Sequence, residues 1–122
     1  MTRILFIDDD VLALQLMSKV TSLLGYQAIL STSPRRALDL VANENPELVV
    51  VDMTMDEMDG PEFVRAVRQM FNMEKTPVVI YSAGTGYSDE ETARKAGANG
   101  YLRKPVGLKE LSLAVQRFAS GQ

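Results

Sequence analysis

Short apolar runs alternate along the chain with longer stretches in which apolar residues recur at helical spacing. The apolar runs predict strands at 3–7, 27–30, 48–51, 77–81 and 100–103. A strand of this kind, apolar at nearly every position, is typical of a parallel sheet that is covered on both faces. The stretches between and after them predict helices at 11–24, 34–44, 60–70, 88–96 and 107–119.

Residues at the ends of the helical stretches support these boundaries. Ser33 followed by Pro34 is an N-cap signal with proline at the first helical position. Ser88, followed by three acidic residues, predicts a second N-cap with an acidic first turn. Gly25 and Gly97 stand where a helix commonly ends in a left-handed residue.

Five repeats of strand and helix indicate one fold class, an α/β fold. Because crossovers between parallel strands are right-handed, the helices are expected to cover both faces of the sheet. The pattern therefore predicts a doubly wound, three-layer sandwich. With 122 residues, the chain has enough length to bury the core of one such domain.

In an open parallel sheet, functional groups gather at the carboxyl ends of the strands. The residues that follow the predicted strands are acids from two strands, a hydroxyl from a third and an ammonium from a fourth: Asp8, Asp9 and Asp10, then Asp52, then Ser82, then Lys104. Adjacent carboxylates repel one another by about 4 kcal/mol at 4 Å and an effective dielectric constant near 20. A counter-charge, either Lys104 or a cation, is therefore expected at this edge.

Composition narrows the chemistry of that edge. The chain contains no cysteine and no histidine, so a bound metal must take oxygen ligands, as Mg²⁺, Ca²⁺ and Mn²⁺ do. The net charge of −3 gives no indication of a nucleic-acid surface. No apolar run is long enough to span a bilayer and no signal peptide is evident, so a soluble, cytoplasmic protein without membrane contact is expected.

Taken in order, these strand-end motifs resemble the receiver domain of bacterial two-component response regulators, and the layout is similar to that of the chemotaxis regulator. The motifs are DD after the first strand, the D of VVVDMTMDEMDG, SA after VVIY, and the Y and KP of GANGYLRKP: Asp8, Asp9, Asp52, Ser82, Ala83, Tyr101, Lys104 and Pro105. The resemblance covers the whole chain. It implies one receiver domain over 1–122, with a flavodoxin-like (βα)5 sheet in the strand order 2-1-3-4-5.

The resemblance also implies a role for each site residue. Asp52 is the phospho-acceptor, and Mg²⁺ (or Mn²⁺) is held by Asp9, Asp52 and the backbone carbonyl of Thr54, with Asp8 acting largely through water. Ser82 and Lys104 bind oxygens of the phosphoryl group. A signalling module of this kind, rather than an enzyme, takes its phosphoryl group from a histidine kinase or a histidine phosphotransfer protein.

Phosphorylation is expected to switch a binding surface. The resemblance implies that Ser82 and Tyr101 move together and change the face formed by the fourth helix, the fifth strand and the fifth helix. It also implies a cis bond between Lys104 and Pro105. The output is expected through a downstream protein or an effector domain beyond Gln122, with no nucleic acid bound directly by these residues.

Some positions leave alternatives open or depart from the family pattern. Asp10 fits a helix N-cap better than a metal ligand. Leu12 and Leu16 either dock a histidine-bearing helical partner or belong to a wide buried face. Asp56 stands where the family usually has proline.

Two other functions on this fold class are less well supported. An aspartyl phosphohydrolase would need a second acid where Thr54 stands, and a cap domain for which the chain has no room. A flavin-binding electron carrier would need a phosphate-binding loop after the first strand, where this chain has acids.

Overall fold

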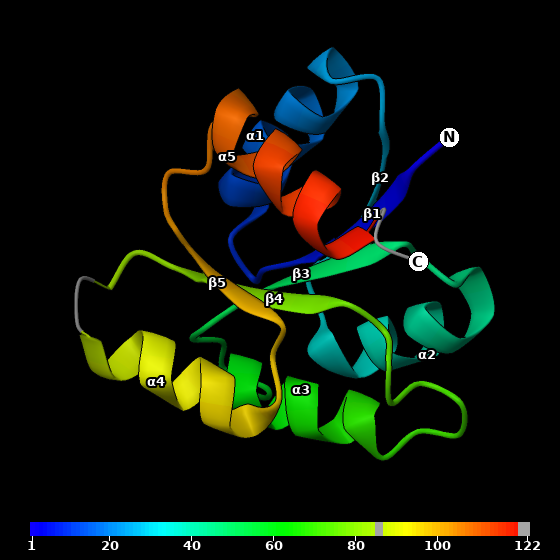
Figure 1. Ribbon diagram of the computed structural model, residues 1–122, viewed down its shortest axis with the longest axis vertical. Helices are drawn as coiled ribbons and strands as arrows, with labels where there is room; N and C mark the ends of the chain where they lie inside the picture. Colours follow the sequence, from blue (N-terminus) through cyan, green and yellow to red (C-terminus); the bar gives the residue numbers. More distant parts are fainter. Residues whose placement is uncertain (85–86, 120–122) are drawn as a thin grey trace.

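Strands and helices alternate throughout the computed structural model, which describes residues 1–84 and 87–119 (Figure 1). The elements are β1 (Arg3–Ile7), α1 (Val11–Leu23), β2 (Gln27–Ser31), α2 (Pro34–Glu44), β3 (Leu48–Asp52), α3 (Gly60–Arg68), β4 (Val78–Ser82), α4 (Tyr87–Ala96), β5 (Gly100–Arg103) and α5 (Leu108–Ala114), which continues as the π-helical segment η1 (Val115–Ala119).

The five strands form one parallel sheet in the order β2-β1-β3-β4-β5, which confirms the predicted strand order. β3 is the central strand, and β1 lies between β2 and β3. Ile7 is paired with Val51, and Asp52 with Tyr81. This register brings the carboxyl ends of β1, β3 and β4 to the same edge of the sheet.

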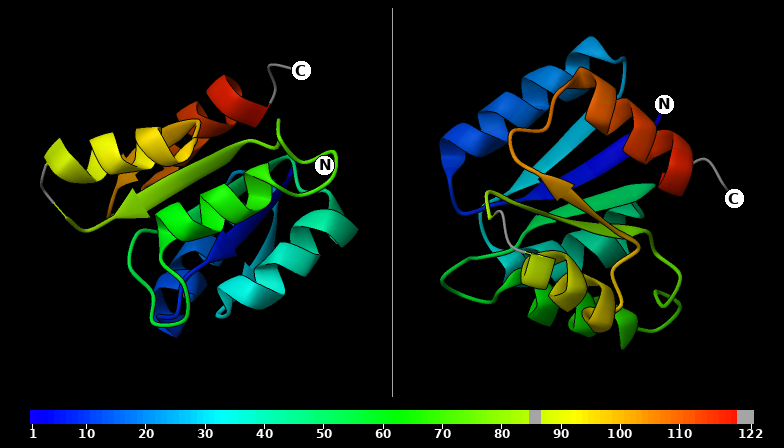
Figure 2. Two further views of the ribbon diagram at one scale, coloured as in Figure 1. Left: turned by 90° about the horizontal axis from the view of Figure 1, so that it is seen from below. Right: turned by 60° about the vertical axis from the view of Figure 1, so that its left-hand side comes forward.

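The helices cover both faces of the sheet, as a doubly wound sandwich requires (Figures 1 and 2). α1 and α5 pack over one face, where Ile4 and Phe6 point, while α2, α3 and α4 cover the other face, where Leu5 and Ile7 point. All four of these β1 residues are fully buried. Burial on both faces explains why the strands read as continuous apolar runs rather than alternating ones.

The predicted helix ends agree with the structure to within two residues (α3, for example, ends at Arg68 rather than near Met70), and the N-cap predicted for α4 is wrong. The side chain of Ser33 caps α2, and Gly25 and Gly97 follow α1 and α4 with φ values of +81° and +104°. α4, however, begins at Tyr87, so Ser88 lies inside the first turn and is not the N-cap. Serine and acidic residues suit the first turn almost as well as the cap, so the signal placed the boundary one residue late.

The helices are short compared with the thickness of a bilayer. Among the helices in the described part of the chain, α1 is the longest with 13 residues, whereas a membrane crossing needs about 20. Within residues 1–84 and 87–119, none of the helices combines the length and apolar character needed to cross a membrane.

Candidate functional site

Three carboxylates meet where β1 and β3 end. Asp8, Asp9 and Asp52 each place a carboxylate oxygen within 4.8 Å of the other two. Asp8 and Asp52 are 1% and 9% exposed, whereas Asp9 faces solvent. The parallel pairing of β1 with β3 causes this meeting, because both strands run into their acids at the same edge.

Lys104 follows β5 and reaches the acid cluster from beside the end of β4. Its Nζ lies 2.9 Å from Oδ2 of Asp8 and 3.0 Å from Oδ1 of Asp52. The backbone helps to fix this approach, since the Lys104 amide donates to the Ser82 carbonyl at 2.9 Å. The bond between Lys104 and Pro105 is cis. Burial alone lowers the pKa of Lys104, but the hydrogen bonds to Asp8 and Asp52 outweigh it and the pKa lies above its usual value.

The charge at this edge is not balanced by the described side chains alone. Burial raises the pKa of Asp52, and the neighbouring charges of Asp8 and Asp9 raise it further, while Lys104 opposes the shift. Among the residues described, the cluster thus holds three carboxylates, whereas Lys104 is ion-paired with only two of them, Asp8 and Asp52. A divalent cation would relieve this excess of negative charge.

The donor set fits a hard divalent cation. All the side-chain ligands offered are carboxylate oxygens, and one of them, from Asp9, is open to solvent. Mg²⁺ typically takes one or two carboxylates and keeps several waters, which a half-exposed pocket allows. Thr54, whose carbonyl is the expected backbone ligand, lies two residues beyond Asp52 in the exposed β3–α3 loop.

Tyr81 is a site residue that the sequence analysis did not identify. Its hydroxyl donates to Oδ2 of Asp8 at 2.8 Å, and its ring lies 4.5 Å from Nζ of Lys104. Burial raises the pKa of Tyr81, and the hydrogen bond to Asp8 raises it further, so the phenol stays protonated. A buried tyrosine needs a partner for its hydroxyl. Its place in VVIYS, just before the strand end, was the signal available.

Ser82 ends β4 beside the acid cluster, but its hydroxyl bonds to Asp89 and Gly84 rather than to the acids of the cluster. Its hydroxyl donates to Oδ2 of Asp89 at 3.2 Å and accepts from the Gly84 amide at 2.9 Å. Gly84 leaves space for this contact, because a Cβ there would be 2.1 Å from the Asp89 carboxylate. Ser82 therefore links the strand end to the first turn of α4.

Tyr101 lies on β5 and packs toward α4. Its side chain is half-buried against the cluster of apolar residues on that face, and its hydroxyl donates to the Gly84 carbonyl at 3.3 Å. Ser82 and Tyr101 thus bond to the same short segment after β4. The two residues that the sequence analysis paired as a switch are connected through Gly84.

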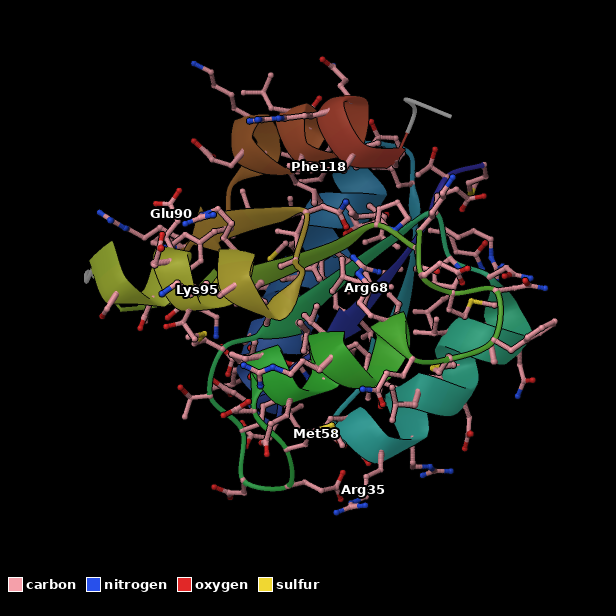
Figure 3. The ribbon with its side chains drawn as sticks, turned by 60° about the horizontal axis from the view of Figure 1, so that its bottom comes forward. Arg35, Met58, Arg68, Glu90, Lys95 and Phe118 are labelled. Atoms are coloured by element: carbon pink, nitrogen blue, oxygen red, sulfur yellow. The ribbon has the colours of Figure 1, made fainter. Side chains whose placement is uncertain are left out.

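The β3–α3 loop is held by hydrogen bonds at two adjacent residues, Asp56 and Glu57. The Asp56 amide donates to Oδ2 of Asp9 at 3.2 Å. The Glu57 carboxylate accepts from the Ser33 hydroxyl at 2.8 Å and from the Arg35 amide at 3.1 Å. Figure 3 shows this region, with Met58 of the loop labelled near Arg35 of α2.

Gly60 allows α3 to start directly against the strand end. A Cβ at this position would lie 2.7 Å from the carbonyl oxygen of Asp52. The Asp59 side chain caps α3, and Glu62 returns a bond to the Asp59 amide. The backbone that carries Asp52 is therefore enclosed by the helix that follows it.

Two further predictions concern α1. Asp10 is its N-cap, since its carboxylate accepts from the Leu12 amide at 3.0 Å, as predicted. Leu12 and Leu16 are 73% and 49% exposed, so they do not belong to a wide buried face. The side chains that α1 buries are Leu14, Met17, Val20 and Thr21.

Comparisons with known proteins agree on one family. The family model for the response regulator receiver domain matches residues 4–116. Response regulator MprA of Mycolicibacterium vanbaalenii is 36% identical over 109 residues, which cover 89% of this chain and 46% of MprA. Regulatory protein AtoC of Escherichia coli is 38% identical over 119 residues, covering 94% of this chain and 24% of AtoC.

Structural comparison gives the same result. The chemotaxis protein CheY4 of Vibrio cholerae superposes with a TM-score of 0.89 at 28% identity, covering 97% of this chain and 98% of CheY4. The chain spans less than half the length of the two curated relatives, at 46% and 24%.

Proposed function

The chain belongs to the response regulator receiver domain family, and on this premise we propose that Asp52 accepts a phosphoryl group in a Mg²⁺-dependent reaction. One observation carries the proposal. Lys104 lies between Asp8 and Asp52, so the acid cluster holds a buried acceptor carboxylate with a cation already aimed at it. Transfer of a phosphoryl group depends mainly on such positioning and neutralisation of charge.

In the proposed step, an oxygen of Asp52 attacks the phosphorus of a phosphohistidine on a partner protein. The O–P bond forms and the N–P bond breaks, and the imidazole nitrogen keeps the electron pair. Lys104 binds a phosphoryl oxygen as a point charge. Ser82 turns its hydroxyl from Asp89 to another phosphoryl oxygen, since serine hydroxyls rotate to suit their acceptor.

The residues that would hold Mg²⁺ are Asp9, Asp52 and the carbonyl of Thr54, with Asp8 orienting the ion. Bound Mg²⁺ neutralises negative charge on the transferring phosphoryl group. Tyr81 keeps Asp8 in place and Lys104 keeps Asp8 from repelling Asp52 at full strength. These two donors let the acids lie close together before any cation binds.

Phosphorylation would be read through the α4–β5–α5 face. When the Ser82 hydroxyl leaves Asp89, the first turn of α4 loses a contact. Gly84, which donates to this hydroxyl and accepts from Tyr101, is then held less firmly. A surface hollow lies between these elements, lined by residues that include Glu90, Tyr101, Leu113 and Phe118. Figure 3 labels Glu90 on α4 and Phe118 on η1. A change at Tyr101 would therefore alter this hollow, where a downstream protein or effector domain is expected to bind.

The phosphoryl donor is expected to be a histidine kinase or a histidine phosphotransfer protein. The given sequence has no histidine, so the donor imidazole lies outside these residues. Leu12 and Leu16, exposed on α1 next to the acid cluster, offer an apolar contact for a helix that carries this histidine.

The proposal is tested by intact mass after incubation with acetyl phosphate and Mg²⁺. The protein should gain one phosphoryl group, and EDTA should abolish the gain. Asp52→Asn should not be modified, whereas Asp39→Asn, at an exposed position on α2, should react like the unsubstituted protein. Because a short-lived adduct could escape detection, beryllofluoride with Mg²⁺ is added as a second arm, followed by NMR. No mass gain together with an unchanged spectrum would refute the proposal.

A further inference from the structure

Asp9 and Asp56 are linked by a hydrogen bond that ties the β3–α3 loop to the end of β1. The Asp56 amide donates to Oδ2 of Asp9 at 3.2 Å, across 47 positions of sequence. The donor is the backbone N–H, so the side chain of residue 56 does not make this bond. A proline at position 56 would have no N–H and could not make it.

Asp9 needs such a support more than the other two acids do. Asp8 accepts from Tyr81, Lys104 and the Asp10 amide, and Asp52 accepts from Lys104. Asp9, in contrast, is exposed to solvent. An exposed aspartate loses rotamer freedom when it binds a cation, and that loss weakens binding. A donor fixed on one oxygen lowers the loss and leaves the second oxygen available to the ion.

Hydrogen bonds on both sides of Asp56 hold this part of the loop, and with it the Asp56 amide, in place. The next residue, Glu57, is bonded to Ser33 and Arg35 at the start of α2. At the base of the loop, the Gly60 amide donates to the Met53 carbonyl at 2.9 Å. Asp56 therefore lies between two fixed points, and its amide direction is set by the fold.

We propose that the Asp56 backbone N–H is a positioning group for the cation site, acting through Asp9. It fixes Oδ2 of the Asp9 carboxylate, one of whose oxygens lies within 4.8 Å of carboxylate oxygens of Asp8 and Asp52. Outer hydrogen bonds of this kind orient metal ligands and raise affinity. The Asp56 side chain adds a second, weaker effect, since its exposed negative charge attracts cations in a salt-dependent way. This inference rests on the proposed Mg²⁺ site.

Three substitutions separate the amide from the charge. Asp56→Asn and Asp56→Ala keep the N–H and remove the charge, whereas Asp56→Pro removes both. The dissociation constant for Mg²⁺, measured by calorimetry without any phosphoryl donor, is the readout. Asp56→Pro should bind Mg²⁺ about three- to tenfold more weakly than Asp56→Ala. Asp56→Asn should lose less Mg²⁺ affinity than Asp56→Pro, and this loss should shrink as the salt concentration is raised.

An NMR measurement tests the bond directly, without metal and without a proline variant that could misfold. In Asp9→Ala, the Asp56 amide proton should move upfield, because it loses a carboxylate acceptor. The Glu57 amide serves as a neighbouring reference and should move less.

The outcomes discriminate between the two proposals. An unchanged Asp56 resonance in Asp9→Ala would overturn the inference, as would equal Mg²⁺ affinity of Asp56→Pro and Asp56→Ala. In both cases the proposed function would stand if the unsubstituted protein binds Mg²⁺. If the unsubstituted protein binds no Mg²⁺, the metal site fails and the inference fails with it.

Discussion

The hydroxyl of Tyr81 donates to Oδ2 of Asp8 at 2.8 Å, and Lys104 donates to the same oxygen at 2.9 Å. Asp8 is almost fully buried, so its charge is acceptable only because it is bonded in this way. Lys104 also reaches Asp52, whereas Tyr81 serves Asp8 alone among the hydrogen bonds of the described side chains. Asp8 is thus held by Tyr81 of β4 as well as by Lys104.

Removing the Tyr81 hydroxyl should therefore destabilise the protein. Tyr81→Phe keeps the buried ring but leaves Asp8 with one donor fewer, and hydrogen bonds to charged groups contribute about 1.5–3 kcal/mol. We expect the free energy of unfolding, measured in urea at pH 7 with EDTA, to fall by about 2 kcal/mol. Tyr101→Phe is the matched control, since its half-exposed bond to Gly84 is 3.3 Å long. A loss no larger than that of the control would contradict the role given to Tyr81.

Lys104→Met should reveal the repulsion that the lysine now offsets. The variant keeps the side-chain length but leaves Asp8 and Asp52 without their shared cation. Because Lys104 is 23% exposed, the loss should be about 2 kcal/mol, below the 3–5 kcal/mol of a fully buried pair. Added Mg²⁺ should stabilise the variant more than it stabilises the unsubstituted protein. Without Lys104, the acid cluster has more unneutralised negative charge and should bind the ion more tightly, and stabilisation by a ligand grows with its affinity for the folded state.

The control for that experiment is Lys95→Met. Lys95 is 71% exposed and lies 3.9 Å from Glu91, so its removal should cost less than about 0.5 kcal/mol. Equal losses in the two variants, or equal stabilisation by Mg²⁺, would show that Lys104 is not the counter-charge of the acid cluster.

The sequence predicts the sheet well because one physical cause acts on every strand. Burial on both faces makes β1, β3 and β4 uniformly apolar, and each run ends where its polar side chain reaches the sheet edge. Asp8, Asp52 and Lys104 could be placed together for this reason. Their strand ends meet whatever the details of the loops.

The parts that the sequence did not predict depend on contacts between distant segments. Tyr81 resembles an ordinary strand aromatic, and its bond to Asp8 spans 73 positions. The bond from Asp56 uses a backbone N–H, which every residue except proline carries, so the residue type does not reveal it in the sequence. Leu12 and Leu16 lie on a helix with more apolar residues than one face needs, and only the packing shows which are exposed.

Asp52→Asn should stabilise the protein at neutral pH when no divalent cation is present. Burial raises the folded-state pKa of Asp52 above its unfolded value of 3.8, with further increases from Asp8 and Asp9. The folded state therefore binds the proton more tightly, and stability falls as pH rises through the folded pKa. Asparagine removes this loss while still offering Lys104 an acceptor oxygen.

The gain should follow pH in a defined direction. It should be largest at pH 7 and should disappear below about pH 3.8, where Asp52 is protonated in both states. Urea midpoints with EDTA from pH 3 to 7 measure it, with Asp39→Asn on exposed α2 as the control. A variant that is less stable than the unsubstituted protein at pH 7 would mean that the bond to Lys104 outweighs burial.

Glu57 should contribute to stability through its hydrogen bonds to α2, with a pH dependence opposite to that of Asp52. Hydrogen bonds from the Ser33 hydroxyl and the Arg35 amide lower the pKa of Glu57 below 4.5. A carboxyl with a lowered folded pKa stabilises the fold above its unfolded pKa, and the contribution is lost as pH falls through the folded pKa. Glu57→Gln should therefore lower the urea midpoint at pH 7 and leave it unchanged at the acid end of the range. Glu74→Gln, in the exposed α3–β4 loop, should change neither. A difference between Glu57→Gln and the unsubstituted protein that did not depend on pH would show that the Glu57 charge does not anchor the loop to α2.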